Sequence, residues 1–324
     1  EATRTFSAAQ DWTAGGIKTL VLFFRGDPAN GAGQVYVKIN NTKVSYSGNA
    51  SAIAKALWTQ WNIDLTGVPG LQAVQSLTLG VSGSGSGKLL IDDIRLYREA
   101  PPVPVPTDPG TTGLAAYYTF TGDARDSAGT YHGTAVNDPT YVESQSGMGQ
   151  GIRFDGVNDY VDLPIGSLIG SLTSATVATW VNVDAANAGA WQRVFDFGTS
   201  DTAGYMFLTP SAGTSGVVRF AISKTTGGAA ESTVTSPARD LTGWHHMAVV
   251  IDGAARTIQL YLDGEVVATN ATATLPADLG QTPQNWLGRS QYAADGYLTA
   301  TLDEFRIYRR VLSAGEVLYL AGAR

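Results

Sequence analysis

The chain has 324 residues, a length that allows one to three domains with a sizeable core in each. Only 15% of the residues are charged and 38 are glycine, a composition that favours a turn-rich, all-β protein. The chain has no cysteine, which excludes disulfides and thiolate metal sites. The net charge of −7 argues against nucleic acid or an anionic membrane as partner, and no apolar run reaches the length of about 18 residues that spans a bilayer.

The first predicted domain, residues 1–98, is a series of short strands. Alternating apolar and polar side chains indicate strands over 2–6, 18–25, 34–39, 57–65, 75–82 and 88–97. Residues 53–58 could form one helical turn. Strands joined by Gly, Asn and Ser turns are typical of a β-sandwich. Because these strands are few for a closed sandwich and the chain starts abruptly at Glu1, we expect a piece of a longer protein with upstream strands missing.

A proline-rich segment follows at residues 99–113. Its sequence, EAPPVPVPTDPGTTG, holds five of the 13 prolines. Proline cannot donate to a sheet ladder, and its fixed φ favours the extended polyproline II conformation. The segment therefore predicts a semi-rigid linker between the first domain and a second domain at residues 114–324.

The second predicted domain has the same alternation at greater length. Strands are indicated at 115–120, 151–155, 159–163, 175–183, 193–198, 205–208, 217–223, 244–251, 257–268 and 299–309. Asp263-Gly264, flanked by apolar alternation, predicts a hairpin turn. Ser313 and Glu316 form a capping-box pattern that begins a short helix, Ser313 to Ala323. These elements predict a jelly roll or a related sandwich.

Five stretches of this domain resemble a known family. In chain order they are GIRFDGVNDYVDLP, GWHHMAVVID, IQLYLDGEVV, LGRS and TLDEFRIYRRVLSAGEV. Together they look like the LamG-like group of the concanavalin A-like jelly rolls, over about 200 residues and in the family's order. The first domain resembles more weakly the galactose-binding-like sandwiches of carbohydrate-binding modules, through its DWT opening and IDDIRLY ending. These resemblances imply sugar or protein binding in secreted bacterial polysaccharide-degrading or surface proteins.

One phrase occurs near the end of both domains. IDDIRLYR, residues 91–98, returns as LDEFRIYR at residues 302–309. If Ile94 faces the core, strand alternation places Asp92 on the same inward face, and Asp303 likewise with Phe305. A buried carboxylate without a partner costs several kcal/mol, so it requires a cation, a row of amides or a metal.

Calcium is the metal that suits such carboxylates and loop carbonyls. The family resemblance implies a structural Ca²⁺ with an aspartate in this closing strand, and we expect Asp92 and Asp303 to be ligands. Asp123 and Asp126, in GDARDSAG, are the expected companions in the second domain. The alternative is that Asp92 and Asp303 lie half exposed near the strand start or cap a turn.

No catalytic pattern is found. The family's glucanases place acids on one strand as Glu-x-Asp-x-x-Glu, and this sequence contains no such trio. Asp196, in VFDFG, stands alone. His245 and His246 are neighbours on a strand and point to opposite faces, so they cannot hold one zinc ion. No G-x-S-x-G lies between a strand and a helix. We expect no catalytic residue.

Sugars are held by aromatic faces and by planar polar side chains. Among seven Trp and 14 Tyr, loop position selects Trp191 and Arg193, which follow the small-residue loop DAANAGA. Arg289, Gln291 and Tyr292 lie in another loop that the family topology brings near the first. These five residues are the predicted ligand site; the alternative is that Trp191 and Arg193 only cover the end of the sandwich. In the first domain the weaker candidates are Trp12, Trp58 and Trp61.

The leading functional hypothesis is a non-catalytic pair of carbohydrate-binding sandwiches from a secreted or cell-surface bacterial protein. The expected partner is a polysaccharide or other glycan, with no nucleic acid, no membrane insertion and a monomeric chain. Two alternatives stay open. The domains could be adhesion or structural spacers that bind protein or no ligand, or part of a polysaccharide-active enzyme with an unrecognised site.

Overall fold

The computed structural model describes residues 1–83, 87–145, 147–184, 189–200, 203–213, 216–225 and 230–322. The chain divides into two compact units, Glu1–Val105 and Pro106–Arg324, with the division inside the proline-rich segment. In the second unit, Thr107 donates its backbone N–H to the carbonyl of Gly315, and the Arg310 guanidinium donates to the carbonyls of Pro109 and Thr112. The later part of the segment is therefore hydrogen-bonded to the second unit. Within the described ranges, none of the helices combines the length and apolar character needed to span a bilayer.

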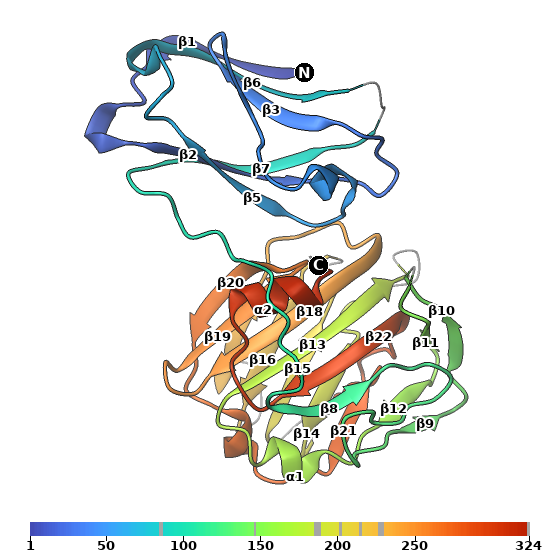
Figure 1. The fold of residues 1–324 in the computed structure, drawn as a ribbon. Helices are drawn as coiled ribbons and strands as arrows, with labels where there is room; N and C mark the ends of the chain where they lie inside the picture. The colour runs from blue at the N-terminus through green and yellow to red at the C-terminus, as the bar shows by residue number, and fades with distance from the viewer. Residues whose placement is uncertain are drawn as a thin grey trace. The chain divides into compact units, whose positions relative to one another are not determined.

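The first unit is built from two antiparallel sheets, which Figure 1 shows as two layers. One sheet has the order β1 (Ala2–Gln10), β6 (Val74–Ser82), β3 (Gln34–Ile39), β4 (Thr42–Ser45). The other has the order β5 (Thr59–Asp64), β2 (Thr19–Arg25), β7 (Leu90–Tyr97). Short 3₁₀ turns lie at η1 (Ala14–Gly16), η2 (Ala50–Ala54) and η3 (Leu71–Ala73). Inward side chains such as Leu22, Val37 and Ile63 fill the space between the sheets.

The second unit also consists of two antiparallel sheets. In the described residues, the larger has the order β10 (Thr140–Glu143), β11 (Gln150–Asp155), β22 (Thr299–Tyr308), β13 (Ala175–Val183), β18 (Gly243–Asp252), β19 (Thr257–Leu262), β20 (Glu265–Ala271), and β8 (Leu114–Tyr118) pairs with β22. We call it the large sheet. The other, the small sheet, has the order β17 (Ser232–Thr235), β16 (Arg219–Ser223), β15 (Tyr205–Thr209), β14 (Phe195–Gly198), β21 (Gln284–Leu287), β12 (Tyr160–Asp162), β9 (Thr134–Val136).

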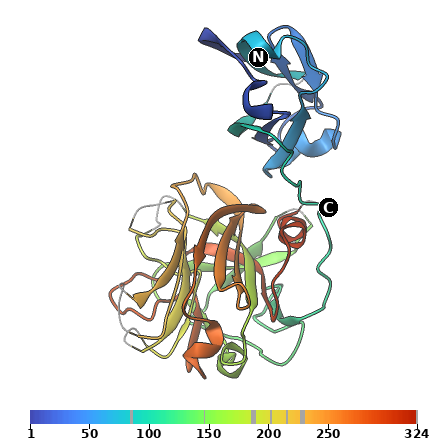
Figure 2. The ribbon, with the colours of Figure 1, turned by 90° about the vertical axis from the view of Figure 1, so that its left-hand side faces the viewer.

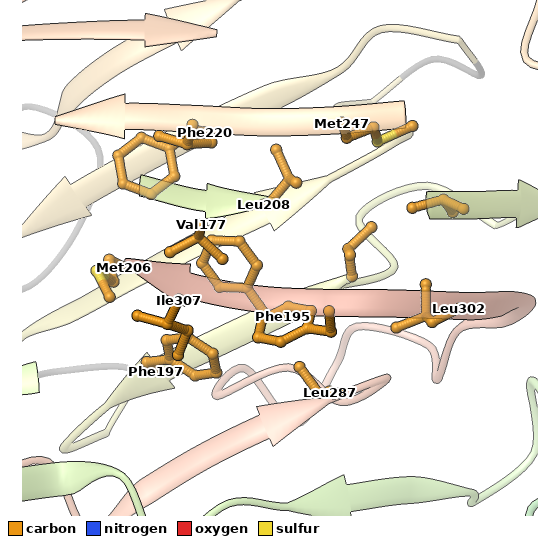
Figure 3. Close-up of a cluster of buried hydrophobic side chains, with 14 of the residues drawn as sticks. Val177, Phe195, Phe197, Met206, Leu208, Phe220, Met247, Leu287, Leu302 and Ile307 are labelled. Atoms are coloured by element: carbon orange, nitrogen blue, oxygen red, sulfur yellow. The ribbon is translucent and has the colours of Figure 1, made fainter. Parts of the chain in front are cut away.

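Buried side chains from both sheets meet in one core. Figure 3 shows Phe195, Phe197 and Leu208 of the small sheet close to Val177 and Ile307 of the large sheet. The strand registers place one inward row across the small sheet, comprising Val234, Phe220, Leu208, Phe195, Leu287 and Val161. Burial of these apolar faces is the main stabilisation of a two-layer sandwich.

The outer face of the large sheet is partly covered by a helix. α2 (Ala314–Leu320), shown in red in Figure 2, packs Val317 and Leu320 into a buried cluster with Ala178 and Tyr308. Its N-terminus has the predicted capping box between Ser313 and Glu316. The described part of this unit also contains the helical segments α1 (Gly166–Ile169) and η5 (Pro276–Leu279).

The prediction of an all-β protein with sandwich domains is confirmed. Strand β13 has the predicted bounds, and Asp263-Gly264 forms the predicted hairpin turn, with φ of 52° and 83°. The prediction missed α1 and several strands, namely β4, β9, β10, β17 and β21. Each of these elements has only three or four residues, which is too few for alternation to be recognised.

The repeated phrase forms the same backbone feature in both units. Asp93 has φ of 50° and Glu304 has φ of 54°, and the pairing of β7 with β2 and of β22 with β13 shifts register at these points. In each case the preceding aspartate accepts the next residue's N–H, at 2.8 Å for Asp92 and 2.7 Å for Asp303. The phrase therefore forms a β-bulge with one residue in the left-handed region.

The bulge reverses the expected orientation of both aspartates. Leu302 pairs with the core residue Val181, whereas Asp303 pairs with Trp180 on the outer face of the large sheet. Phe305, after the bulge, is again in the core. The side chains of Asp303 and Phe305 therefore lie on opposite faces of the large sheet. The expectation that they share a face is wrong, because the extra residue of the bulge shifts the alternation by one position. Asp92 is exposed, so it is not an inward residue either.

Candidate functional site

The outer face of the small sheet gathers most of the predicted ligand residues. The registers place one row of side chains on this face, comprising Thr233, Ala221, Phe207, Asp196, Trp286, Asp162 and Thr134. These positions alternate with the inward row that forms the core, so their side chains are not required for packing between the sheets. Aromatic and charged residues at such positions are candidates for binding.

A buried charge cluster forms the base of this region. The Arg193 guanidinium carbon lies 4.0 Å from the centre of the Phe207 ring. Its Nε is 3.3 Å from Asp196 Oδ2, and its Nη2 is 2.8 Å from Asp295 Oδ2. Arg193 is only 2% exposed, so two carboxylates and an aromatic face compensate for the loss of water around its charge.

Asp196 lies entirely inside this base. Burial raises its pKa to about 7, against the opposing effects of the Arg193 charge and the hydrogen bond from the Gln291 N–H. Asp196 Oδ1 and Gln291 Oε1 are both buried without a hydrogen-bond partner among the described residues. Because Asp196 has no exposed surface, its carboxyl group cannot meet a substrate and instead orients Arg193 and the loop at Gln291.

Above the base lies a rim of partly exposed side chains, which we call the Trp191 patch: Trp191, Arg219, Glu231 and Tyr292. Arg219 forms an ion pair with Glu231, and the Tyr205 hydroxyl donates to Glu231 at 2.7 Å. The hydroxyls of Tyr292 and Tyr205 are 3.1 Å apart. Trp191 and Tyr292 both pack against the buried cluster that includes Tyr205 and Phe207.

The backbone of Trp191 is held in an unusual conformation. Its φ is 63°, in the left-handed region that a bulky residue rarely occupies. Its N–H donates to the Ser211 carbonyl at 2.8 Å, and its own carbonyl accepts from the Arg193 guanidinium. Such strained residues cluster at functional sites, where surrounding contacts maintain them.

Four of the five predicted ligand residues come together in this region, namely Trp191, Arg193, Gln291 and Tyr292. Arg289 does not join them, because its guanidinium lies over the ring of Trp286, at 4.1 Å from the centroid. The sequence analysis missed Arg219, Glu231 and Asp295, although the outward position of Arg219 follows from the alternation of β16. In the first unit, Trp12 and Trp61 belong to the core, while Trp58 is partly exposed.

The four predicted calcium ligands each accept protein hydrogen bonds. Asp303 is buried, with Oδ2 2.5 Å from the Ser144 hydroxyl. Asp126 accepts the backbone N–H groups of Tyr117, Ala128 and Tyr131. Asp123 is exposed and accepts the N–H of Arg125, and Asp92 accepts that of Asp93.

These carboxylates do not form a metal-binding group. Among the described residues, no three His, Asp or Glu side chains lie close enough together to hold a metal ion. Ca²⁺ takes six to eight oxygen ligands, so the predicted acids do not by themselves fit the ion. The calcium site stays a prediction that chelation measurements test.

The two histidines of β18 are buried on opposite faces of the large sheet. His245 Nδ1 is 2.8 Å from Asp263 Oδ2. His246 packs edge-on against Trp180, and burial lowers its pKa to about 3. Both side chains therefore contribute to packing within the sheet.

Two of three comparisons place this fold among known proteins. Residues 155–318, all in the second unit, match the model of the concanavalin A-like lectin/glucanases superfamily, Laminin_G_3. Domain 4 of AbnA, an extracellular GH43 arabinanase from Geobacillus stearothermophilus in complex with arabinotriose, is 22% identical with a TM-score of 0.54, over 64% of this chain and 98% of that one. No curated protein matches the sequence.

Two toxin domains share the fold at lower identity. The binding domain of Paraclostridial Mosquitocidal Protein 1 is 14% identical with a TM-score of 0.51. The binding domain of botulinum neurotoxin serotype D is 11% identical with a TM-score of 0.50. Each match covers 65% of this chain and 52% of the toxin chain. The family match covers half of the sequence, and the chain belongs to the concanavalin A-like lectin/glucanase superfamily.

Proposed function

We propose that the second unit binds carbohydrate without catalysis, through the Trp191 patch. The observation that carries this proposal is the position of Trp191, a partly exposed indole fixed above a buried base of Arg193, Phe207 and Tyr205. A pre-positioned aromatic ring loses little conformational freedom when a ligand binds, which favours affinity.

The chemistry of the patch suits a sugar ring. The C–H face of a sugar stacks on an aromatic ring, and its hydroxyls both donate and accept hydrogen bonds. Arg219 supplies donors, and Glu231 supplies acceptors, close to the indole of Trp191, whose centroid lies 6.0 Å from the Arg219 guanidinium. The patch thus combines an apolar face with a planar donor and a planar acceptor, the small set of polar groups that gives a binding site its specificity.

The carboxylates around the patch support binding rather than hydrolysis. Glycosidases use two carboxyl groups on either side of the scissile bond, one of which is a proton donor. Glu231 forms an ion pair with Arg219, and Asp295 forms one with Arg193, so each of these carboxyl groups is already held by a cation of the site. Asp196, whose pKa is raised to about 7, is sealed beneath the loop.

Arabinose oligosaccharides are a reasonable first probe. The GH43 arabinanase domain that shares this fold holds arabinotriose, although at 22% identity it indicates the fold and not the ligand. We further propose that the chain is a monomer from a secreted or cell-surface bacterial protein. A location outside the cell or on its surface is where such a protein encounters polysaccharides. The tandem arrangement with a sugar-binding first unit belongs to the same proposal.

The test uses the full chain on a glycan array, followed by titration calorimetry with the glycans that bind. Trp191→Ala should lower affinity by about 1–3 kcal/mol, or roughly 5- to 150-fold, because it removes the stacking face. Trp244→Ala is the matched control, since Trp244 is also a partly exposed tryptophan but lies on the large sheet. Equal losses in the two variants, or no glycan bound by the wild type, would contradict the proposal.

A further inference from the structure

A second aromatic surface lies on the same outer face of the small sheet. We call it the Tyr160 platform: Tyr160, Trp286 and Tyr297, bordered by Arg289 and Asp162. The centroids of Tyr160 and Trp286 are 6.1 Å apart with planes at 72°, and those of Tyr160 and Tyr297 are 6.3 Å apart. The Arg289 guanidinium lies 4.1 Å from the Trp286 centroid and 4.8 Å from that of Tyr160. All three rings are partly exposed.

The platform is not explained by the packing of the core. In β12 and β21 the alternate residues Val161 and Leu287 are fully buried between the sheets, and the rings of Tyr160 and Trp286 point the other way. Three large aromatic side chains gathered outside the core leave apolar surface in contact with water. Contiguous exposed apolar surface with a polar border marks a binding site more often than a fold requirement.

One loop carries residues of both sites. This loop, residues 288–298, is closed by a hydrogen bond between its two ends. Leu298 donates its backbone N–H to the carbonyl of Gly288 at 2.9 Å. Asp295 accepts from Ser290 and from Arg193, both at 2.8 Å, which fixes the loop to the buried base. Tyr292 therefore lies in the Trp191 patch, while Arg289 and Tyr297, near the two ends of the loop, belong to the platform.

We propose that the Tyr160 platform is a second carbohydrate subsite, which binds uncharged sugar residues of the same glycan chain that the Trp191 patch holds. This inference rests on the proposed function of the second unit and specifies its ligand as a neutral oligosaccharide or polysaccharide longer than a single sugar.

The charges at the platform favour an uncharged ligand. Arg289 and Asp162 border the same rings, so the cation is opposed by a nearby anion. Burial raises the pKa of Asp162, against the lowering effects of a hydrogen bond from Trp286 and of the Arg289 charge. The chain as a whole carries a net charge of −7, which repels polyanions. A donor and an acceptor at the border of an aromatic face match the hydroxyls of neutral sugars.

The spacing of the two sites requires a ligand of several sugar rings. Three neighbouring strands span the two sites: Trp286 pairs in register with Asp196, and Asp196 pairs with Phe207. Phe207 lies beneath the Trp191 patch. Adjacent strands lie about 4.8 Å apart, so the platform starts about 10 Å from Phe207 and extends one strand further to Tyr160. The loop between the sites has small, exposed residues at Ala293, Ala294 and Gly296, which leave room for a chain to cross.

The test compares oligosaccharides of three and six sugars, from arabinan and from xylan, by titration calorimetry with the full chain. The wild type should bind the six-sugar ligand at least tenfold more tightly than the three-sugar ligand. Trp286→Ala should lower the affinity for six sugars to nearly that for three and change the latter less than threefold. Tyr297→Ala is a second variant at the same platform and should have the same effect, whereas Trp244→Ala, on the large sheet, should bind as the wild type does.

The outcomes separate this inference from the function on which it rests. If Trp191→Ala lowers affinity but Trp286→Ala and Tyr297→Ala do not, the Trp191 patch binds alone and the second subsite is refuted. If no neutral oligosaccharide binds the wild type, the second subsite is refuted, and the proposed function fails with it only if no glycan of any kind binds. Tighter binding of oligogalacturonate than of the neutral series would overturn the assignment of an uncharged ligand.

Discussion

Asp303 shows how one buried side chain links sequence, stability and pH. Its side chain is fully buried, and burial raises its pKa to about 7, well above the value of 3.8 for a free aspartate. Between these two pKa values the folded protein binds more protons than the unfolded chain. The free energy of unfolding contributed by Asp303 therefore falls as the pH rises from about 4 to 7.

We predict that Asp303→Asn removes this part of the pH dependence. Asparagine can accept the Glu304 N–H through its oxygen and donate to the Ser144 hydroxyl through its amide, without a buried charge. At pH 8 the variant should be as stable as the wild type or more stable by about 1–3 kcal/mol, measured by urea denaturation at several pH values. Asp155→Asn, at an exposed position of the same sheet, controls for the loss of one negative charge.

The same variant also tests the predicted calcium site. If Ca²⁺ holds Asp303, the variant should instead lose stability at pH 8, and a chelator should destabilise the wild type more than the variant. That result would contradict the description of Asp303 as a buried acid held only by protein hydrogen bonds.

At the scale of single residues, the sequence selected residues of the candidate site better than it predicted where each one lies. Trp191 and Tyr292 follow small-residue and polar loop sequences, and both are partly exposed at the patch. Arg289 comes three residues before Tyr292, yet it lies over Trp286 in the platform. The sequence could not separate them, because the loop is held between the two residues by the Gln291 N–H, whose acceptor Asp196 is far away in the sequence.

Among the elements, the bulge of β7 and β22 is the feature that sequence alternation could not reveal. The alternation on either side of Asp92-Asp93 and of Asp303-Glu304 predicts one continuous regular strand in each unit. Asp93 and Glu304 adopt positive φ, and each pairs with the arginine two residues later, Arg95 or Arg306. The repeated phrase is thus explained by a shared backbone requirement.

The bulge makes a prediction at Asp93. Valine avoids the left-handed region, so Asp93→Val should lower the free energy of unfolding by about 1–2 kcal/mol, as measured by chemical denaturation. Asp93→Asn should be nearly neutral, since asparagine tolerates positive φ while losing the ion pair with Arg95. Equal effects of the two substitutions would show that the backbone conformation at this position is not what the phrase preserves.

Long strands were predictable and short ones were not. Strands such as β13 and β18 have enough residues for their apolar runs to be recognised, and the Asp-Gly turn and the capping box were found because specific residues determine them. The short strand β21 gave no such signal, yet it carries Trp286. The Tyr160 platform was missed because β21 was not recognised. Its three rings also come from strands and a loop that lie far apart in the sequence.

At the scale of the whole molecule, the two outer faces of the second unit differ. The large sheet has part of its outer face covered by α2, whereas the small sheet carries partly exposed aromatic and charged side chains on its outer face. The family resemblance predicted the fold of this unit because its motifs occur in order over most of the domain. It could not assign the ligand, which depends on loops and outward side chains that the fold leaves free to vary.

The most direct test of the central claim is fluorine NMR of the full chain labelled with 5-fluorotryptophan. Its seven tryptophans are assigned by single Trp→Phe substitutions, and the spectrum is recorded during titration with a six-sugar oligosaccharide that binds on the array. The resonances of Trp191 and Trp286 should shift, while those of Trp12, Trp61 and Trp244 should not. Saturable shifts confined to Trp58 or Trp244, with Trp191 unchanged, would contradict the assignment of glycan binding to the outer face of the small sheet.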